Sequence, residues 1–348
     1  MQQTISRFAE PLEDRVTTHS TVGVEGVAPV FVLAAPRSFS SVVSSMLGQH
    51  PQLYGLPELE LFESATVAQW WELNAQSTGP RSHGMLRAVA ELVFGEQTEA
   101  TIRLARGWLW RRSHLSTGYL FEMLARKVWP RVPVDKSTTY VWRVRGMYRS
   151  FQMFPNARFI HLVRHPRGHA ESVLKLLKYV QQQGPPLPPN HWLFRLAGDT
   201  WRGGAGADGP RAEAPGADPV LDPQNSWYAL NSNVCRFLNA VPADQQRRIR
   251  GEDFLTDPDG HIRELCRWLG IDDGAEAVEK TKHPEESPYA RIGPDGARFG
   301  NDVFFLEDPV LRLAPAKPQS LEGPLSWRPD GTQLRPKVKQ LAREFGYE

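Results

Sequence analysis

The stretch VFVLAAPRSFSSVVSSMLGQHP, residues 30–51, decides the fold of this chain. An apolar segment leads into a short polar loop and then into apolar residues at helical spacing, which predicts a strand, a loop and a helix. Backbone N–H groups at a helix N-terminus lack intrahelical partners and carry partial positive charge, so they favour an anion. The loop adds the charge of Arg37 and the hydroxyls of Ser38, Ser40 and Ser41. The pattern therefore predicts a phosphate site.

This loop differs from that of a nucleotide kinase or ATPase. Those enzymes carry GxxxxGK followed by Ser or Thr, with the Lys on the β- and γ-phosphates and the hydroxyl on magnesium. Neither that Lys nor that spacing occurs here. We therefore expect a site for one terminal phosphate rather than for a triphosphate.

A second segment, FPNARFIHLVRHPRGHAES at residues 154–172, repeats the same design. Residues 157–163 are apolar and β-prone, turn-forming Pro and Gly follow, and residues 170–180 have helical spacing. Arg164 closes the strand, and Ser172 lies eight residues later. An Arg at a strand end and a Ser in the next helix can both reach a second phosphate, the Arg through its bidentate fork.

Together these motifs resemble the sulfotransferases. The loop PRSxSS with a helix ending in HP, and the Arg and Ser around LVRxP, match elements that bind the 5′-phosphosulfate and the 3′-phosphate of 3′-phosphoadenosine 5′-phosphosulfate (PAPS). VDKST at 134–138 and IRGEDFLTDPDGHIRELCRWLGI at 249–271 are similar to two later family segments, so four matches fall in family order. The resemblance implies a P-loop-like fold, PAPS as donor and adenosine 3′,5′-bisphosphate as product. The implied donor-binding residues are Arg37, Ser38, Phe39, Ser40, Ser41, Arg164 and Ser172.

The chain departs from the family pattern in two places. Many cytosolic members carry Lys in the first loop, whereas the Arg37 form resembles the tyrosylprotein and bacterial branches. The Gly-rich closing segment that contacts the 3′-phosphate in cytosolic members has no clear counterpart here. The sequence therefore does not identify the residues that bind the adenosine.

Sulfuryl transfer needs a base for the proton of the acceptor and cations for the developing charge, and it demands neither a metal nor a covalent intermediate. Turn formers in HPQLYGLPELELF, residues 50–62, would bring Glu58 back toward the phosphosulfate. A glutamate at matching spacing, 21 residues after the loop Arg, is the proposed base in tyrosylprotein sulfotransferases, which this segment resembles. The alternative is that Glu58 caps a helix beginning at Leu59.

His283 is the second base candidate. It lies in TKHPEESPYARIGPDGARFGND, residues 281–302, a run rich in turn formers that is similar to one in sulfotransferase domains of polyketide and nonribosomal peptide assembly lines. Those domains use a His in this region, and a neutral imidazole has a suitable pKa. Either Glu285 or Glu286 could orient it. The alternative is an ordinary surface His.

Lys136 is the candidate for stabilising charge on the transferring group. It follows a predicted strand, and a Lys there points into the crevice at the carboxyl edge of a parallel sheet. The alternative is a surface ion pair with Asp135, which would contribute little.

The chain alternates strands and helices, which predicts an α/β fold with a parallel central sheet flanked by helices. We expect one sulfotransferase domain over residues 1–348. Strands are expected near 30–35, 132–134, 158–163 and 247–250, helices over 60–73, 84–108 and 115–128, and an amphipathic helix within LRPKVKQLAREFGY near the C-terminus. Residues 181–226 are rich in Pro and Gly and are expected to be a flexible insertion, or a lid carrying the aromatic patch HWLF at 191–194.

Composition places the protein in solution. Its 41 Lys and Arg against 39 Asp and Glu give a net charge of +2, so no overall field draws it to nucleic acid or to membranes, and anion binding depends on local clusters. Two cysteines are too few for a disulfide framework. The polar N-terminus lacks the core of a signal peptide, and no apolar run is long enough to span a bilayer. We expect a cytoplasmic enzyme.

The acceptor is left open by the sequence. The resemblance implies a hydroxyl of a small molecule of secondary metabolism, either free or bound to a carrier protein. Sulfation of an amine, a phenol or a glycan is the alternative, and the sequence does not determine the oligomeric state. A phosphotransferase of the nucleotide-kinase type would explain the first loop only. A non-catalytic nucleotide-binding protein would need Arg37 and Arg164 but not Glu58 or His283.

Overall fold

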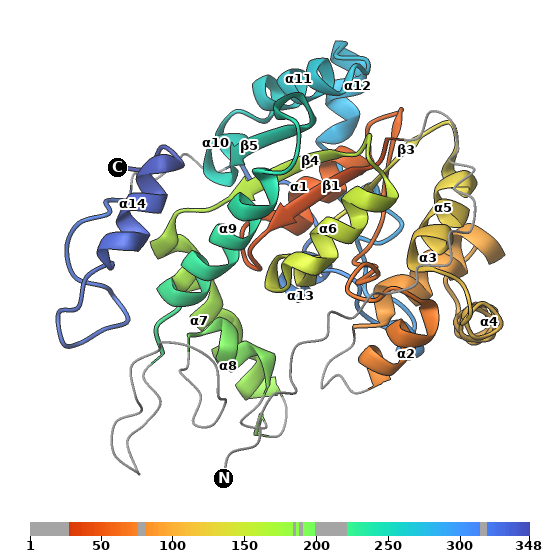
Figure 1. Cartoon of the computed structure of the whole chain (residues 1–348), viewed down its shortest axis with the longest axis horizontal. Helices are drawn as coiled ribbons and strands as arrows, with labels where there is room; N and C mark the ends of the chain where they lie inside the picture. The colour runs from red at the N-terminus through yellow and green to blue at the C-terminus, as the bar shows by residue number, and fades with distance from the viewer. Residues whose placement is uncertain (1–27, 76–80, 184–185, 188–190, 199–220, 314–318) are drawn as a thin grey trace, which may run out of the picture.

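The computed structural model describes residues 28–75, 81–183, 186–187, 191–198, 221–313 and 319–348. Its centre is a parallel sheet in the order β2-β3-β1-β4-β5. The strands are β1 (Val30–Ala34), β2 (Leu53–Gly55), β3 (Val132–Asp135), β4 (Arg158–Val163) and β5 (Gln246–Arg250). The predicted α/β fold with a helix-flanked parallel sheet is confirmed (Figure 1).

Helices follow the strands and cover both faces of the sheet (Figure 1). In the first half these are α1 (Ser40–Gly48), α2 (Val67–Ala75), α3 (His83–Phe94), α4 (Glu99–Trp110), α5 (Thr117–Val128), α6 (Val144–Met153) and α7 (Pro166–Gln183). In the second half they are α8 (Trp192–Leu196), α9 (Gln224–Leu238), α10 (Gly251–Thr256), α11 (Pro258–Leu269), α12 (Ala275–Thr281), α13 (Val303–Glu307) and α14 (Pro336–Glu344). Short 3-10 helices span Thr138–Trp142, Ala243–Gln245, Pro284–Glu286 and Asp295–Ala297.

The central strand β1 shows why the sheet needs cover on both sides. Its five residues are all buried, and because successive side chains point to opposite faces they divide between two clusters. Phe31 and Leu33 join the cluster under α3 to α9, whereas Val30, Val32 and Ala34 join the cluster under α1, α10, α11 and α12. A fully apolar strand in the sequence is therefore the signature of this central position.

Several sequence predictions of helices need correction. Residues 60–73 do not form one helix: residues 56–66 are without helix, and α2 begins at Val67. The expected helix over 84–108 is two, because Gly95 ends α3 with a φ of 85° and a capping box at Thr98 begins α4. The helix expected from 170 begins earlier, at Pro166, since Pro is well suited to a first helical turn. The short strand β2 was not predicted.

Other predicted elements agree with the structure. The expected strands coincide with β1, β3, β4 and β5, and the helix expected over 115–128 is α5. The C-terminal amphipathic helix is α14, which buries Val338 and Leu341 against a cluster that includes Trp227 of α9. Both cysteines are free thiols. None of the helices in the described ranges is long and apolar enough to cross a membrane.

The Pro- and Gly-rich stretch 181–226 is described only in part, and residues 184–185, 188–190 and 199–220 lie outside the described residues. The aromatic patch HWLF falls in α8 and its N-cap. Leu193 and Leu196 are buried in the main cluster, while Trp192 is 40% exposed. The patch thus packs partly on the body of the domain.

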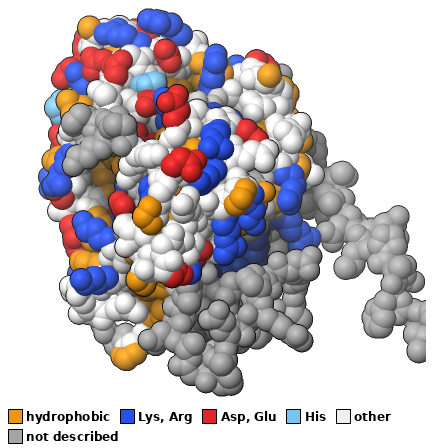
Figure 2. Space-filling model, turned by 90° about the vertical axis from the view of Figure 1, so that its left-hand side faces the viewer, with side chains coloured by type: hydrophobic (Ala, Val, Ile, Leu, Met, Phe, Trp, Pro, Cys, Tyr) orange, Lys and Arg blue, Asp and Glu red, His pale blue; other side chains and the backbone are white. Residues whose placement is uncertain are grey.

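The connections of the sheet place two loops side by side. After β1 the chain moves to one side, toward β2 and β3, whereas after β4 it moves to the other side, toward β5. Neighbouring strands whose connections diverge in this way open a crevice at their carboxyl ends, where ligands of α/β proteins bind. On the face of the molecule that carries α14, acidic and basic side chains are interspersed (Figure 2), so a local crevice, not an overall field, must select an anion.

Candidate active site

The loop between β1 and α1 has the conformation of an anion cradle. Arg37 and Phe39 both have positive φ, 71° and 64°, a conformation that costs an L-residue roughly 1–2 kcal/mol and that accumulates at functional sites. Phe39 is the N-cap of α1 and offers no side-chain hydrogen bond, so the first turn of the helix is not capped by its own side chain. The backbone N–H groups that begin α1 are thus available to a ligand.

The second predicted element contacts the first. Arg164, which follows β4, donates from Nη1 to the carbonyl oxygen of Arg37 at 2.8 Å, and its guanidinium lies 4.2 Å from the ring centre of Phe39. Ser172 on α7 accepts a hydrogen bond from Nε of Arg37 at 3.2 Å. Two segments that are more than a hundred residues apart therefore form one cationic site.

Arg164 is built to receive a further acceptor. Its Nε is buried and has no hydrogen-bond partner among the described residues. Gly168 in the first turn of α7 makes room for it, because a Cβ there would lie 3.2 Å from that nitrogen. A buried donor without an acceptor is costly, and a phosphate oxygen would remove that cost.

Arg37 has an anionic partner that the sequence analysis missed. Its guanidinium forms an ion pair with Asp302, and it also lies 5.0 Å from the ring centre of Phe304 at the start of α13. Burial and, to a lesser extent, the nearby charge of Arg164 together lower the pKa of Arg37 to about 10. Asp302 belongs to the run 281–302 in which only His283 and its neighbouring glutamates were singled out.

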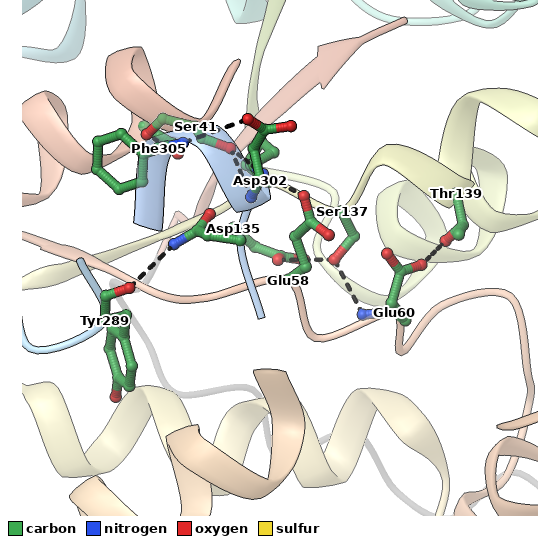
Figure 3. Close-up of polar contacts among 12 residues, drawn as sticks. Ser41, Glu58, Glu60, Asp135, Ser137, Thr139, Tyr289, Asp302 and Phe305 are labelled. Atoms are coloured by element: carbon green, nitrogen blue, oxygen red, sulfur yellow. Dashed lines mark hydrogen bonds and ion pairs between the residues drawn. The ribbon is translucent and has the colours of Figure 1, made fainter. Parts of the chain in front are cut away.

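Lys136 and Glu58 meet beside the loop between β1 and α1. Lys136, 1% exposed, forms an ion pair with Glu58 and donates from Nζ to Ser41 Oγ at 3.0 Å. Ser41 Oγ also accepts the backbone N–H of Asp302 at 3.3 Å, as Figure 3 shows, so its own proton can be donated to a ligand. Lys136, Glu58 and Ser41 thus form one polar cluster beside the cationic site.

The structure excludes the simpler interpretation of each of these two residues. No helix begins at Leu59, so Glu58 does not cap one. Lys136 does not form a surface pair with Asp135, since both side chains are buried and Asp135 instead accepts hydrogen bonds from Ser137 and Tyr140.

His283 is half-exposed and pairs with carboxylates close to it in the chain. Its side chain is 46% exposed, and Nδ1 lies 2.9 Å from Oε1 of Glu285, with Glu279 at 4.0 Å from Nε2. The hydrogen bond with Glu285 raises the pKa of His283 above its ordinary value. Among the described residues, these two carboxylates are its ion-pair partners, and none comes from the Lys136 cluster.

Other basic residues near the two anion-binding elements make structural contacts or are exposed to solvent. His161 in β4 is a satisfied core residue, bonded at 3.0 Å to a side-chain amide of α9. Arg167 donates to four carbonyl groups within Ser320–Pro324 and so anchors the C-terminal segment. Arg143 and Arg145 are exposed.

Two further buried carboxyl groups lie beside Glu58. Burial raises the pKa of Asp135 to about 7, although hydrogen bonds from Tyr140 and Ser137 oppose the shift. Burial likewise raises the pKa of Glu60 to about 8. Asp135 lies within the VDKST motif and Glu60 within the segment that carries Glu58.

A parallel sheet with paired anion-binding elements at its switch point suits a ligand that carries two anionic groups. Residues 29–186, which carry both elements, match a family model described as the sulfotransferase family. By that match, this part of the chain is similar to the sulfotransferase family.

Two solved structures are similar to nearly the whole chain. A sulfotransferase domain from the curacin biosynthetic pathway superposes with a TM-score of 0.68 at 22% identity, covering 92% of this chain and 98% of that one. A sulfotransferase domain from the olefin synthase of Synechococcus PCC 7002 gives 0.65 at 24% identity, covering 93% and 97%. A search of curated protein sequences found no match. At these identities the structures establish the fold.

Proposed function

We propose that this enzyme moves a sulfuryl group from PAPS to a hydroxyl of a small-molecule or carrier-bound acceptor by direct in-line transfer. The observation that carries the proposal is the contact between the two anion elements, in which Arg164 bonds the Arg37 carbonyl at 2.8 Å and Ser172 bonds the Arg37 side chain at 3.2 Å. Two adjacent anion sites suit a nucleotide with phosphates at both ends of its ribose. The similar structures from a biosynthetic pathway and an olefin synthase support a biosynthetic acceptor.

The residues present fit this donor. The N-terminus of α1, Arg37 and the loop serines would hold the phosphosulfate, and Arg164 with Ser172 would hold the 3′-phosphate. The unpartnered Nε of Arg164 and the uncapped first turn of α1 supply donors in excess of what the protein itself uses. PAPS, when bound, supplies an activated sulfur with a phosphate leaving group.

The cluster at Lys136 supplies the remaining chemistry. A base takes the proton of the acceptor hydroxyl, the oxygen–sulfur bond to the acceptor forms, and the bond from sulfur to the bridging oxygen breaks. Lys136 lies where it can offset the charge that develops on the transferring group and the leaving oxygen. Glu58, which touches Lys136, is the base candidate with contacts in the site, whereas His283 would need to approach from its exposed position.

Calorimetric titration with adenosine 3′,5′-bisphosphate tests the proposal. We expect tight binding that does not need magnesium and that falls strongly for 5′-AMP, which lacks the 3′-phosphate. A preference for ATP with magnesium would instead support a phosphotransferase. Sulfation of an amine or phenol would be detected in the acceptor screen that follows.

Ser172→Ala should weaken the binding of adenosine 3′,5′-bisphosphate by about 3- to 10-fold, the effect of one lost hydrogen bond. Affinity for 5′-AMP should change less, because the lost hydroxyl donates to the 3′-phosphate and reaches the 5′ side only through its bond from Arg37 Nε. Ser232→Ala, at a half-buried serine of α9, is the matched control. If the binding of both nucleotides weakened equally, the assignment of Ser172 to the 3′-phosphate would be wrong.

Glu58→Gln and His283→Ala should separate the two base candidates. If Glu58 is the base, Glu58→Gln lowers kcat by roughly 10²- to 10⁴-fold at unchanged nucleotide affinity, and His283→Ala has little effect. If His283 is the base, kcat rises with pH through a pKa above 6.5, because the imidazole must be neutral to accept a proton, and this limb disappears in His283→Ala. His114→Ala, at an exposed histidine, is the control.

A further inference from the structure

A buried carboxylate organises the segment that carries Glu58. Asp135, at the end of β3, is 1% exposed and accepts two hydrogen bonds, from Ser137 Oγ at 3.1 Å and from the Tyr140 hydroxyl at 2.8 Å. When Asp135 is ionised it can only accept, so each hydroxyl then donates its single proton to it. The oxygen of each hydroxyl is then oriented as an acceptor.

Both oxygens receive peptide N–H groups of one loop. Ser137 Oγ accepts the N–H of Glu60 at 3.0 Å, a contact visible in Figure 3, and the Tyr140 hydroxyl accepts the N–H of Leu61 at 3.3 Å. One carboxylate therefore fixes two successive peptide groups through two hydroxyl relays. At the other end of this loop, the N–H of Glu58 donates to the Gly300 carbonyl at 2.8 Å.

The loop needs such support. Glu60 has a φ of 53°, in the left-handed region that a residue with a side chain rarely adopts. Its carboxylate is buried and accepts a hydrogen bond from Thr139, in the same 3-10 helix as Tyr140. The relays and this contact tie residues 58–61 to the segment 135–140.

This arrangement sets the geometry of the catalytic pair. Lys136 adjoins Asp135 in the chain, and Glu58 lies two residues before the first clamped peptide. Asp135 thus holds the segment 58–61 against the segment 135–140. The ion pair between Lys136 and Glu58 is a further link between the same two segments. A base held in place before reaction loses less orientational freedom on reaching the transition state.

We propose that Asp135 is a positioning residue for sulfuryl transfer, acting through Ser137 and Tyr140 to hold the Glu58–Leu61 loop so that Glu58 faces Lys136. The inference rests on the proposed function for its kinetic consequence. Its structural consequence, an ordered loop, does not depend on which reaction the enzyme catalyses.

Asp135→Asn tests the relays with little change in volume. Its amide nitrogen donates and cannot accept, so at least one hydroxyl loses its acceptor and turns away from the loop. We expect kcat to fall about 10- to 100-fold while the dissociation constant for adenosine 3′,5′-bisphosphate changes less than about 2-fold. Tyr140→Phe removes one relay and should lower kcat about 3- to 10-fold. Tyr148→Phe, at a half-buried tyrosine on α6, is the control.

Hydrogen exchange provides a readout that does not need the acceptor. In Asp135→Asn and in Tyr140→Phe, the amide of Leu61 should exchange about 10-fold faster than in the wild type, with amides of α9 unchanged. Exchange and kcat that both match the wild type in either folded variant would overturn the proposal. So would a fall in melting temperature with normal kcat and normal loop exchange, since Asp135 would then only stabilise the fold. Faster loop exchange in an enzyme that does not bind the bisphosphate would retain the positioning role and reject the proposed donor.

Discussion

Lys136→Met should lower kcat by about 10²- to 10³-fold and leave the dissociation constant for adenosine 3′,5′-bisphosphate within about 3-fold of the wild-type value. The buried ammonium group contacts Ser41 and Glu58 beside the loop, where charge would develop in the proposed transfer. The bisphosphate lacks the sulfuryl group, so binding it does not use the interaction that Lys136 makes in the transition state. Steady-state kinetics and calorimetry on the same preparation separate these two effects.

The fold should tolerate this substitution. Methionine fills most of the volume of the lysine stem, and the Glu58 side chain, 23% exposed, can be solvated once its partner is gone. Lys280→Met, at an exposed pair with Glu276 on α12, is the matched control. An equal loss of turnover and of bisphosphate affinity would show that Lys136 binds the nucleotide rather than the transition state.

The sequence predicted those parts of the fold whose causes are local. The wholly apolar strand β1, the breakers after β4 and the amphipathic spacing of α14 each occupy a few neighbouring residues. The break between α3 and α4 also has local signals, namely Gly95 and the capping box at Thr98. The continuous apolar spacing across the break nevertheless suggested one helix.

The prediction of a helix over residues 60–73 was wrong for a different reason. Leu59, Leu61 and Phe62 are buried, and the i, i+3 spacing of Leu59 and Phe62 resembles that of a helix face. The segment is instead held by hydrogen bonds to Ser137, Tyr140 and Gly300. Partners so distant in the sequence outweigh local propensity, and no pattern within the segment reveals them.

Contacts between distant residues also limited the prediction of the site. Loop motifs indicated Arg37, Arg164, Ser172 and Lys136 because each follows a recognisable strand, and the structure brings all four to one edge of the sheet. Asp302 could not be placed, since nothing in a single sequence pairs a carboxylate with an arginine 265 positions earlier.

Arg37→Ala and Asp302→Asn should shift affinity for adenosine 3′,5′-bisphosphate in opposite directions. Arg37→Ala removes a charged donor and should weaken binding about 10- to 100-fold, corresponding to roughly 1.5–3 kcal/mol. The Asp302 carboxylate forms an ion pair with the same guanidinium and repels an incoming phosphate. Asp302→Asn should therefore strengthen binding about 10-fold at low salt, and less as screening grows. Calorimetry at two ionic strengths measures both shifts.

The double variant decides whether Asp302 acts through Arg37. If the carboxylate competes for that guanidinium, Asp302→Asn gains nothing once Arg37 is alanine, and the two effects are strongly non-additive. A gain that persists without Arg37 would mean general repulsion, and weaker binding in Asp302→Asn would mean that the carboxylate orients Arg37 for the donor. Asp308→Asn, which removes the same charge from an ion pair with Arg312 in the same segment, is the control. Because the Asp302 backbone N–H still bonds Ser41 in the asparagine variant, the segment keeps its anchor and the experiment isolates the carboxylate.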